Sequence, residues 1–458
     1  MEIEGWLARA AARQPGRTAL QTPAGSWSYR DLHGAARAGA AELAARGAGP
    51  GTRVAIALPG GLAFAQALHS CLLLGAIAVP LDLRLARAEQ VTIADGCDLH
   101  VREPLAERAP RAGAERARER HRLSAVAAVI HTSGTTAAPR PVELTYGNFL
   151  WSALGSAVAL GCEAEDRWLC ALPLAHVGGL SILIRSAIYA TGAIVHERFE
   201  TDRVLHSLEH EQVALVSLVG TTLERLLEAG LRAPAHLRCA LTGGGPVAPE
   251  LLRRARSAGV PVSLTYGLTE SCSQVTTAPV AEVRVAGGAD VETLAGGEGA
   301  PSDAAGEALF CTRVRIAPDG EILVRGPTVA PGARAADGWL HTGDLGSLDE
   351  RGRLRVHGRR SETIVSGGEN VSPAEVEAVL EGHPGVGEAA VVGRPDPRWG
   401  EAVCAIVVPL DGARPDEEEL RAHCAAALAP YKVPKRIELA RGPLPRTQSG
   451  KLLRRALS

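Results

Sequence analysis

The 458-residue sequence lacks the features that mark membrane and secreted proteins. No run reaches the ~18 uninterrupted apolar residues that a membrane-spanning helix needs. The N-terminus carries acidic residues early and has no apolar core, so no secretory signal is expected. We therefore expect a cytoplasmic protein without membrane insertion.

The sequence also lacks a large excess of charge of one sign, closely spaced cysteine pairs and two common nucleotide-binding motifs. A formal net charge of −2 gives no electrostatic reason to expect a nucleic-acid partner. The nine cysteines form no C-x-x-C pair and have no histidines at zinc spacing, so reduced, mostly buried thiols are expected and a structural metal is not. Neither a G-x-x-x-x-G-K-[ST] motif nor a G-x-G-x-x-G that opens an early helix occurs. Kinase-like and dehydrogenase-like functions are thereby excluded.

What the sequence does contain is an alternation of strand and helix patterns. Strands at 54–58 and 76–81 flank a helix at 63–74, and Asn148 is placed to cap a helix over 149–160. Such alternation predicts parallel sheets with helices on their faces. The expected fold class is α/β, with a large N-terminal domain of sheets layered with helices.

The pattern changes near Gly358. Ser372-Pro-Ala-Glu375 has the form of a capping box with proline at the first helical position, and two strands and a helix follow. We place a domain boundary at 357/358. The expected organisation is a large domain at 1–357 and a small, mobile α+β domain at 358–458.

Three predicted strands end in loops rich in glycine or hydroxyl groups, at 132–136, 243–246 and 265–271. The first can offer backbone N–H and hydroxyl donors to an anion with little side chain in the way. Taken alone, it could equally be a polar connection between a strand and a helix. Ligands gather at the carboxyl ends of strands in parallel sheets, so three such loops at one edge indicate a nucleotide site.

Seven motifs follow one another along the chain, at 132–136, 243–246, 266–270, 338–344, 358–359, 366–370 and 445–451. In order and spacing they resemble those of the acyl-adenylate-forming superfamily of acyl-CoA synthetases, adenylation domains and luciferases. The resemblance covers nearly the whole chain. It implies that a substrate carboxylate attacks the α-phosphate of ATP and expels pyrophosphate, after which the thiol of CoA displaces AMP. Neither step needs an enzyme nucleophile, but both need charge neutralisation and placement.

The resemblance also implies which residues bind ATP: Thr132, Ser133, Gly134, Thr135, Thr136, Arg140, Gly243, Gly244, Gly245, Tyr266, Gly267, Asp344 and Arg359. The loop at 132–136 would hold the β- and γ-phosphates, and Tyr266 would stack on adenine. Asp344 would accept from both ribose hydroxyls. Thr269 would bind the α-phosphate, and Glu270 would ligate Mg²⁺, a hard cation that prefers carboxylate oxygen. The alternative for Glu270 and Asp344 is a solvated loop carboxylate.

The phosphate loop departs from the family's usual T-S-G-T-T-G-x-P-K-G. Ala137 and Pro141 stand where glycines are usual, and Arg140 stands in place of the lysine. Arginine keeps the positive charge as a fork, while alanine and proline restrict the backbone. A stiffer loop is expected.

Lys451, in the last motif, would reach the substrate carboxylate and the α-phosphate during adenylation; the alternative is a tail lysine. It belongs to the small domain, so that domain must swing to complete the site. In the family, a rotation then brings the face around Ser366, Gly367 and Gly368 to the thiol of CoA. The matching hinge is Ser361, where the family more often has Asp or Lys.

The segment 172–185, LPLAHVGGLSILIR, looks most like the o-succinylbenzoate–CoA ligases of menaquinone synthesis. Amino-acid-activating relatives place an aspartate near position 175 or 176, and Ala175-His176 offers none. His176 would line the acyl pocket as a catalytic-site residue; the alternative is a buried, hydrogen-bonded histidine.

The second carboxylate of succinylbenzoate needs donors in the pocket, and Ser181, Arg185 and Ser271 are the candidates. Arg185 could equally be a helix-surface or interdomain arginine. Other readings are a CoA ligase for another aryl or medium-chain acid, and a carrier-loading module that binds adenylates without making free acyl-CoA. Whether the chain forms a homo-oligomer is left open.

Overall fold

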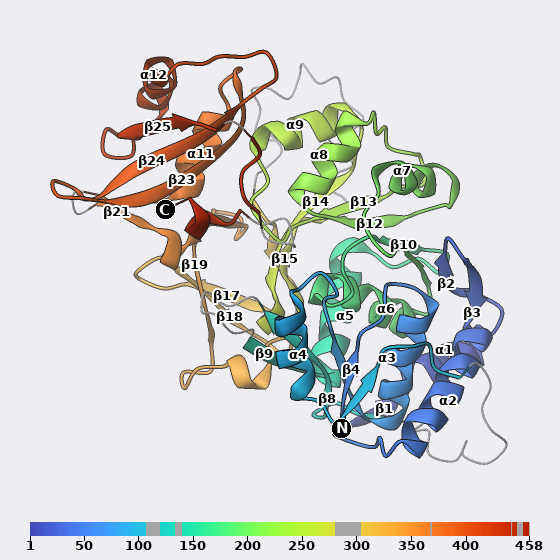
Figure 1. The fold of residues 1–458 in the computed structure, drawn as a ribbon. Coiled ribbons are helices and arrows are strands. Elements are labelled where there is room, and N and C mark those ends of the chain that lie inside the picture. The colour runs from blue at the N-terminus through green and yellow to red at the C-terminus, as the bar shows by residue number, and fades with distance from the viewer. Residues whose placement is uncertain are drawn as a thin grey trace.

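The chain folds into a large lobe and a C-terminal lobe, drawn blue to yellow and orange to red in Figure 1. This computed structural model describes residues 1–106, 120–132, 140–279, 304–366, 369–440, 442–446 and 452–457. Of the expected site residues, Ser133, Gly134, Thr135, Thr136, Gly367, Gly368 and Lys451 lie outside these ranges. Within them, no helix is long and apolar enough to cross a membrane.

A nine-stranded sheet crosses the large lobe in the order β16-β15-β14-β13-β12-β10-β11-β2-β3. The strands from β14 to β2 are paired in parallel, and both edges are antiparallel. The strands are β2 (Thr18–Thr22), β3 (Gly25–Ser28), β10 (Arg167–Cys170), β11 (Gly192–Val195), β12 (Leu215–Leu218), β13 (Cys239–Thr242), β14 (Val262–Leu268), β15 (Ser273–Thr277) and β16 (Glu307–Ala308). Helices α7 (Thr201–His210), α8 (Gly220–Glu228) and α9 (Pro249–Ser257) alternate with them.

A second sheet has the order β6-β4-β5-β8-β9. Its strands are β4 (Arg53–Ile56), β5 (Ile77–Pro80), β6 (Leu99–Val101), β8 (Val126–Thr132) and β9 (Arg140–Thr145). The surrounding helices are α1 (Trp6–Arg13), α2 (Tyr29–Ala45), α3 (Leu62–Leu74), α4 (Arg87–Asp95), α5 (Tyr146–Leu160) and α6 (Val177–Tyr189). Ile56, Ile130 and Val195 belong to one hydrophobic core that both sheets share, so the two sheets form one packed body.

A four-stranded antiparallel sheet follows, with β17 (Arg313–Ile316), β18 (Glu321–Arg325), β19 (Leu340–Leu348) and β20 (Leu354–Arg359). It contains two hairpins, β17–β18 and β19–β20, whose turns include Gly320 and Gly352, both at positive φ. A short pair, β1 (Glu2–Glu4) and β7 (Arg120–Arg122), lies near the N-terminus.

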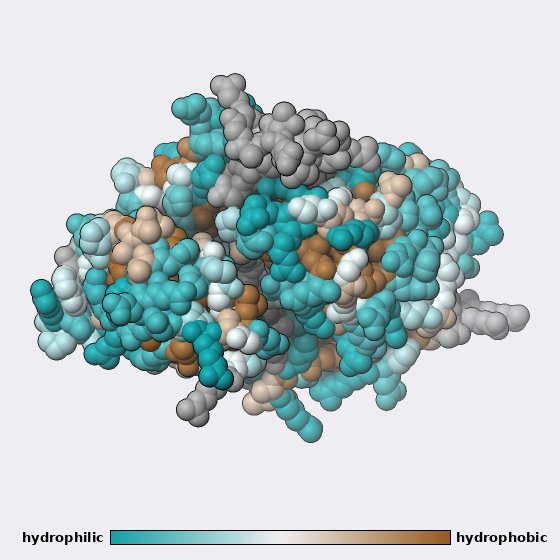
Figure 2. All heavy atoms as spheres, turned by 90° about the horizontal axis from the view of Figure 1, so that it is seen from above, coloured by the Kyte–Doolittle hydropathy of each residue, from teal (hydrophilic) through white to brown (hydrophobic). Residues whose placement is uncertain are grey.

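The C-terminal lobe has its own hydrophobic core, which includes Val376, Val391 and Leu420. Its elements are β21 (Ile364–Ser366), β22 (Glu369–Val371), α11 (Pro373–Glu381), β23 (Val386–Asp396), β24 (Gly400–Pro409), α12 (Glu417–Ala427) and β25 (Arg436–Leu439). Position 357/358 falls inside β20, and the single turn η5 (Arg360–Glu362) connects β20 to the C-terminal sheet. Viewed from above, the hydrophilic surface carries only scattered hydrophobic areas (Figure 2).

Two predicted helix caps are not formed as expected. Helix α5 begins at Tyr146 and is capped by Thr145, whose hydroxyl accepts from the N–H of Asn148. Asn148 is instead the third helical residue, and its side chain accepts from the N–H of Thr145. At α11, Ser372 occupies the N-cap position and Pro373 is the first helical residue, as expected, but the Ser372 hydroxyl makes no capping bond and donates to the carbonyl of His357 in β20. Both side chains bond to other parts of the chain: Ser372 to His357, and Asn148 to Pro327 and Val329.

The predicted ligand loops differ in two ways from the structure. Residues 265–268 continue β14 as a strand, because they pair antiparallel with β15. Strand β8, which leads into the phosphate loop, belongs to a different sheet from β13 and β14. The three segments therefore do not share one sheet edge.

Candidate active site

Glycines bring the backbone of two neighbouring strands close together at the start of the site. After β13, a Cβ on Gly243 would lie 2.6 Å from the carbonyl oxygen of Thr265. In β14, a Cβ on Gly267 would lie 1.8 Å from the carbonyl oxygen of Ser273. The register of β14 and β15 shifts between Tyr266 and Gly267, which forms a bulge. Glycine is required at both positions.

The bulge leads into a tight turn that carries two of the expected ligands. Thr269 and Glu270 lie in the single 3₁₀ turn η2 (Thr269–Ser271). The backbone carbonyl of Glu270 accepts a hydrogen bond from the N–H of Ala330 at 2.8 Å. Glu270 as a whole is partly exposed. Gly244 and Gly245 lie beyond β13, with Gly244 at φ 80°.

The chemistry of this turn suits a hard cation. Thr269 and Glu270 supply hydroxyl and carboxylate oxygen, the donors that Mg²⁺ prefers. In the part of the chain that the structure describes, no group of three or more His, Cys, Asp or Glu side chains could hold a metal. Mg²⁺ at Glu270 would therefore take most of its ligands from phosphates and water, as this ion commonly does.

Asp344 is the best-defined anchor of the site. The residue is only 6% exposed. Oδ2 accepts from the hydroxyl of Tyr266 at 2.7 Å, and Oδ1 lies 2.8 Å from Nε of Arg359. Asp344 and Arg359 are register partners on β19 and β20. Burial, followed by the charge of Asp344, raises the pKa of Tyr266, so its phenol stays a protonated donor.

The ends of the phosphate loop are fixed beside this turn. Thr132 ends β8 and Arg140 begins β9, and the two are register partners. Strand β9 contacts η2. The loop's anchoring strand and the Thr269–Ser271 turn are thus neighbours, although they belong to different sheets.

His176 lies at the start of α6 and is not a buried histidine, because its side chain is 39% exposed. Its Nε2 lies 3.4 Å from Oδ2 of Asp82 and 3.2 Å from a guanidinium nitrogen of Arg84. Burial opposes ionisation of Asp82, but hydrogen bonds from Arg84 and His176 outweigh it and hold the pKa of Asp82 below its ordinary value.

Sequence reasoning missed Asp82 and Arg84. Asp82 follows the carboxyl end of β5, which is paired in parallel with β8. Asp82 therefore lies at the same sheet edge as Thr132, which ends β8. The rule that ligands gather at this edge was the signal that could have found it.

The three candidates for the second carboxylate are all buried. Ser181 is 1% exposed and its hydroxyl has no partner among the described residues. Ser271 accepts from the N–H of Leu268 and contacts carbonyls within its own turn. Arg185 is 2% exposed inside the large lobe, so the surface and interdomain alternatives for it are wrong.

The C-terminal lobe contributes the remaining expected residues. Ser361 lies in η5, between the two lobes along the chain. Ser366 ends β21, is 2% exposed, and pairs with Gly400 of β24. Ser361 follows Arg359 of the anchor by two residues, and its turn η5 contacts β19, the strand that carries Asp344.

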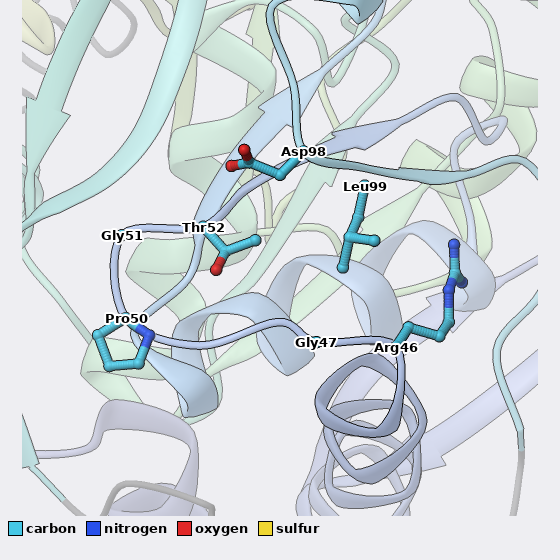
Figure 3. Close-up of a pocket in the computed structure, with 7 residues that line it drawn as sticks. All are labelled: Arg46, Gly47, Pro50, Gly51, Thr52, Asp98 and Leu99. Carbon is cyan, nitrogen blue, oxygen red and sulfur yellow. The ribbon is translucent and has the colours of Figure 1, made fainter.

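An open hollow elsewhere on the surface does not belong to this site (Figure 3). Its lining residues are Arg46, Gly47, Pro50, Gly51, Thr52, Asp98 and Leu99. They precede β4 and β6, and therefore lie at the amino ends of the parallel strands. Asp82 and Thr132 lie at the opposite, carboxyl edge.

Two models of known protein families match this chain. The AMP-binding enzyme family matches residues 7–102 and 85–332, and the AMP-binding enzyme C-terminal domain matches residues 375–451. The chain belongs to the AMP-binding enzyme family. The superfamily and the α/β fold class expected from the motifs are thereby confirmed.

Individual relatives of this AMP-binding enzyme match along its full length. The 2-succinylbenzoate–CoA ligase of Bacillus subtilis is 37% identical over 499 residues, covering 100% of this chain and 98% of the relative. The structure of o-succinylbenzoate CoA synthetase from B. subtilis with its acyl-adenylate intermediate has a TM-score of 0.87 at 36% identity, covering 100% and 98%. A double mutant of that enzyme bound to a product analogue has a TM-score of 0.70 at 36% identity, with the same coverage.

Proposed function

We propose that this chain is an ATP-dependent carboxylate–CoA ligase that converts 2-succinylbenzoate, ATP and CoA to 2-succinylbenzoyl-CoA, AMP and diphosphate. The observation that carries the proposal is the anchor formed by Tyr266, Asp344 and Arg359 beside the Thr269–Ser271 turn. Full-length similarity to a 2-succinylbenzoate–CoA ligase supports the choice of acid. The nine free cysteines support a cytoplasmic location.

In the first half-reaction, the described residues would mainly bind and orient ATP. The carboxylate of Asp344 has lone pairs left after its contacts with Tyr266 and Arg359, and these can accept from the ribose hydroxyls. Thr269 would donate to the α-phosphate. Mg²⁺ bound at Glu270 would supply charge neutralisation of the phosphates. Lys451 would add a positive charge where the substrate carboxylate meets the α-phosphate.

The second half-reaction requires another arrangement of the two lobes. We propose that units 1–357 and 358–458 rotate about Ser361 and bring the 366–368 segment to CoA. The TM-scores of two solved structures, both 36% identical to this chain, support such a rotation. The TM-score is 0.87 for the adenylate complex and 0.70 for the product-analogue complex. The arrangement described here would thus be the one that makes the adenylate.

The acyl pocket is proposed to lie beside His176. The charged contacts of Asp82 and Arg84 fix the orientation of its imidazole. No carboxylate occupies position 175 or 176, and the neighbouring carboxylate of Asp82 is already paired with Arg84 and His176, so a substrate ammonium group has no unpaired counter-charge there. An acid without an amino group is favoured.

The proposal is tested by acid-dependent pyrophosphate release with a panel that contains 2-succinylbenzoate, benzoate and medium-chain fatty acids. We expect a preference for 2-succinylbenzoate, followed by formation of its CoA thioester. Preference for another acid would favour the wider class of aryl or medium-chain CoA ligases. Formation of acyl-AMP without a CoA thioester would favour a carrier-loading module.

The two half-reactions are separated by Lys451→Ala. Removing this charge should lower adenylation by roughly 10²-fold or more, as for the loss of a preorganised donor, and spare thioester formation from supplied acyl-adenylate. Lys432→Ala is the control, because Lys432 pairs with Glu375 within the C-terminal lobe. Equal loss in both half-reactions would refute the role assigned to Lys451.

A further inference from the structure

A chain of buried hydrogen bonds connects two helices to the turn that carries Thr269 and Glu270. A guanidinium nitrogen of Arg185, in α6, donates to the hydroxyl of Ser152 in α5 at 2.9 Å. That hydroxyl donates to the carbonyl of Cys272 at 2.6 Å. The three residues are 2%, 1% and 0% exposed, so this relay is shielded from water.

Arg185 is an unusual group to find in this interior. Among the described residues, no Asp or Glu carboxylate faces its guanidinium, and its Nε has no hydrogen-bond partner. Its guanidinium lies 5.6 Å from the centre of the Trp168 ring. Burial lowers the pKa of Arg185. A buried charge without a counter-charge is costly to stability, so its presence calls for a role outside packing.

The turn that receives the relay has an unfavourable backbone. Cys272 and Ser273 have φ angles of 55° and 90°, in the left-handed region that residues with a Cβ avoid. Such conformations persist only where the surroundings impose them. The hydrogen bond from Ser152 to the carbonyl of Cys272 is such a constraint, and it acts one residue after η2.

Helix α5 also holds the other side of the turn. Asn148, one helical turn before Ser152, donates to the carbonyls of Pro327 and Val329 at 2.7 and 3.1 Å. The next residue, Ala330, donates its N–H to the carbonyl of Glu270. Helix α5 therefore supports this segment at two points: directly at the carbonyl of Cys272, and through Ala330 at the carbonyl of Glu270.

We propose that Arg185 and Ser152 are positioning residues, which hold the Thr269–Ser273 turn in the geometry that receives Mg²⁺ and ATP. Arg185 orients the Ser152 hydroxyl by donating to it, and this leaves the hydroxyl proton directed at Cys272. The proposal rests on the proposed function only in assigning Mg²⁺ and ATP to this turn. It gives Arg185 a role other than binding the second carboxylate of the acid.

The test compares Ser152→Ala and Arg185→Lys with the control Ser186→Ala. Ser186 is next to Arg185 on α6, is 3% exposed, and its hydroxyl has no partner among the described residues. Equilibrium binding of ATP is measured by calorimetry with Mg²⁺ and with a chelator. Hydrogen exchange of the 266–277 peptide reports on the turn itself.

We expect Ser152→Ala to weaken Mg²⁺-dependent ATP binding and to lower the adenylation kcat, each by roughly ten-fold, because the turn is displaced by a fraction of an ångström. Its 266–277 peptide should exchange faster, while the KM for the acid stays within about two-fold. Arg185→Lys keeps the charge but loses the fork, so it should show the same pattern to a smaller degree. Ser186→Ala should match the wild type.

Two results would overturn the proposal. One is a Ser152→Ala protein with the same Mg²⁺-dependent ATP affinity and exchange as Ser186→Ala. The other is an Arg185→Lys protein that binds ATP normally but has a raised KM only for acids with a second carboxylate. That result would make Arg185 a substrate ligand. Failure of the proposed function is a separate result, since ATP binding is measured without any acid.

Discussion

Gly267→Ala should disrupt the candidate site through backbone contact alone. The new Cβ would lie 1.8 Å from the carbonyl oxygen of Ser273, 2.6 Å from its carbonyl carbon and 3.0 Å from the Cα of Gln274. All three atoms belong to the backbone of β15, so no side-chain rotation can relieve the contact. Strands β14 and β15 must move apart at the bulge.

The size of the movement follows from these distances. Real Cβ contacts begin near 3.0 Å, so the backbone must yield by roughly 1 Å, a misplacement that can cost about 10²-fold in rate. Thr269 and Glu270 follow within three residues and would move with it. Overpacking of this kind costs about 1–3 kcal/mol of stability, or about 2–4 °C of Tm per kcal/mol in a domain of this size class.

The assay is acid-dependent pyrophosphate release, combined with thermal unfolding. Gly34→Ala is the control: its Cβ would meet nothing within 4 Å, and it lies inside α2. We expect Gly34→Ala to adenylate normally and to be slightly more stable. If Gly267→Ala kept both the wild-type rate and the wild-type Tm, the close approach of β14 and β15 would be refuted.

Three further changes test other parts of the structure. Asp344→Asn should weaken ATP binding by about ten-fold or more and Tyr266→Phe by only about three-fold, since a charged acceptor contributes more than one neutral donor; calorimetry measures both, and equal effects would contradict the anchor. Asn148→Ala should lower stability by about 2 kcal/mol in chemical denaturation, because it leaves the carbonyls of half-buried Pro327 and buried Val329 without their donor. Burial raises the pKa of Glu381 from 4.5 to about 7, so the stability that Glu381 contributes is fully present below pH 4.5 and is lost as the pH rises through about 7. Glu381→Gln should therefore gain Tm over the wild type as the pH rises through this range, and a difference independent of pH would refute the shift.

Elements with strong local signals were predictable from the sequence. The sequence predicts a helix at 63–74, and the structure has α3 at Leu62–Leu74. Continuous apolar character and bordering glycine or proline residues are enough there. The turns at Gly320 and Gly352 also depend on a local signal. Glycine has no Cβ and therefore permits the positive φ that both residues adopt.

Predictions failed where a partner distant in the sequence decides the outcome. Residues 265–268 form a strand because β15 folds back beside them. Asn148 makes contacts with carbonyls more than 170 residues away. Asp82 meets His176, which lies more than 90 residues further along the chain. None of these neighbours is visible in a local pattern.

The sequence by itself determined the class of this protein, since ordered motifs, helix periodicity and turn residues are properties of short segments. It also indicated that Tyr266, Asp344 and Arg359 belong to one nucleotide site. Only the tertiary structure decided how that site is held: the ion pair across β19 and β20, and the relay from Arg185 to the Thr269–Ser273 turn. The physical reason is that the strength of a buried charge or hydrogen bond depends on which groups exclude water around it, and those groups come together only on folding.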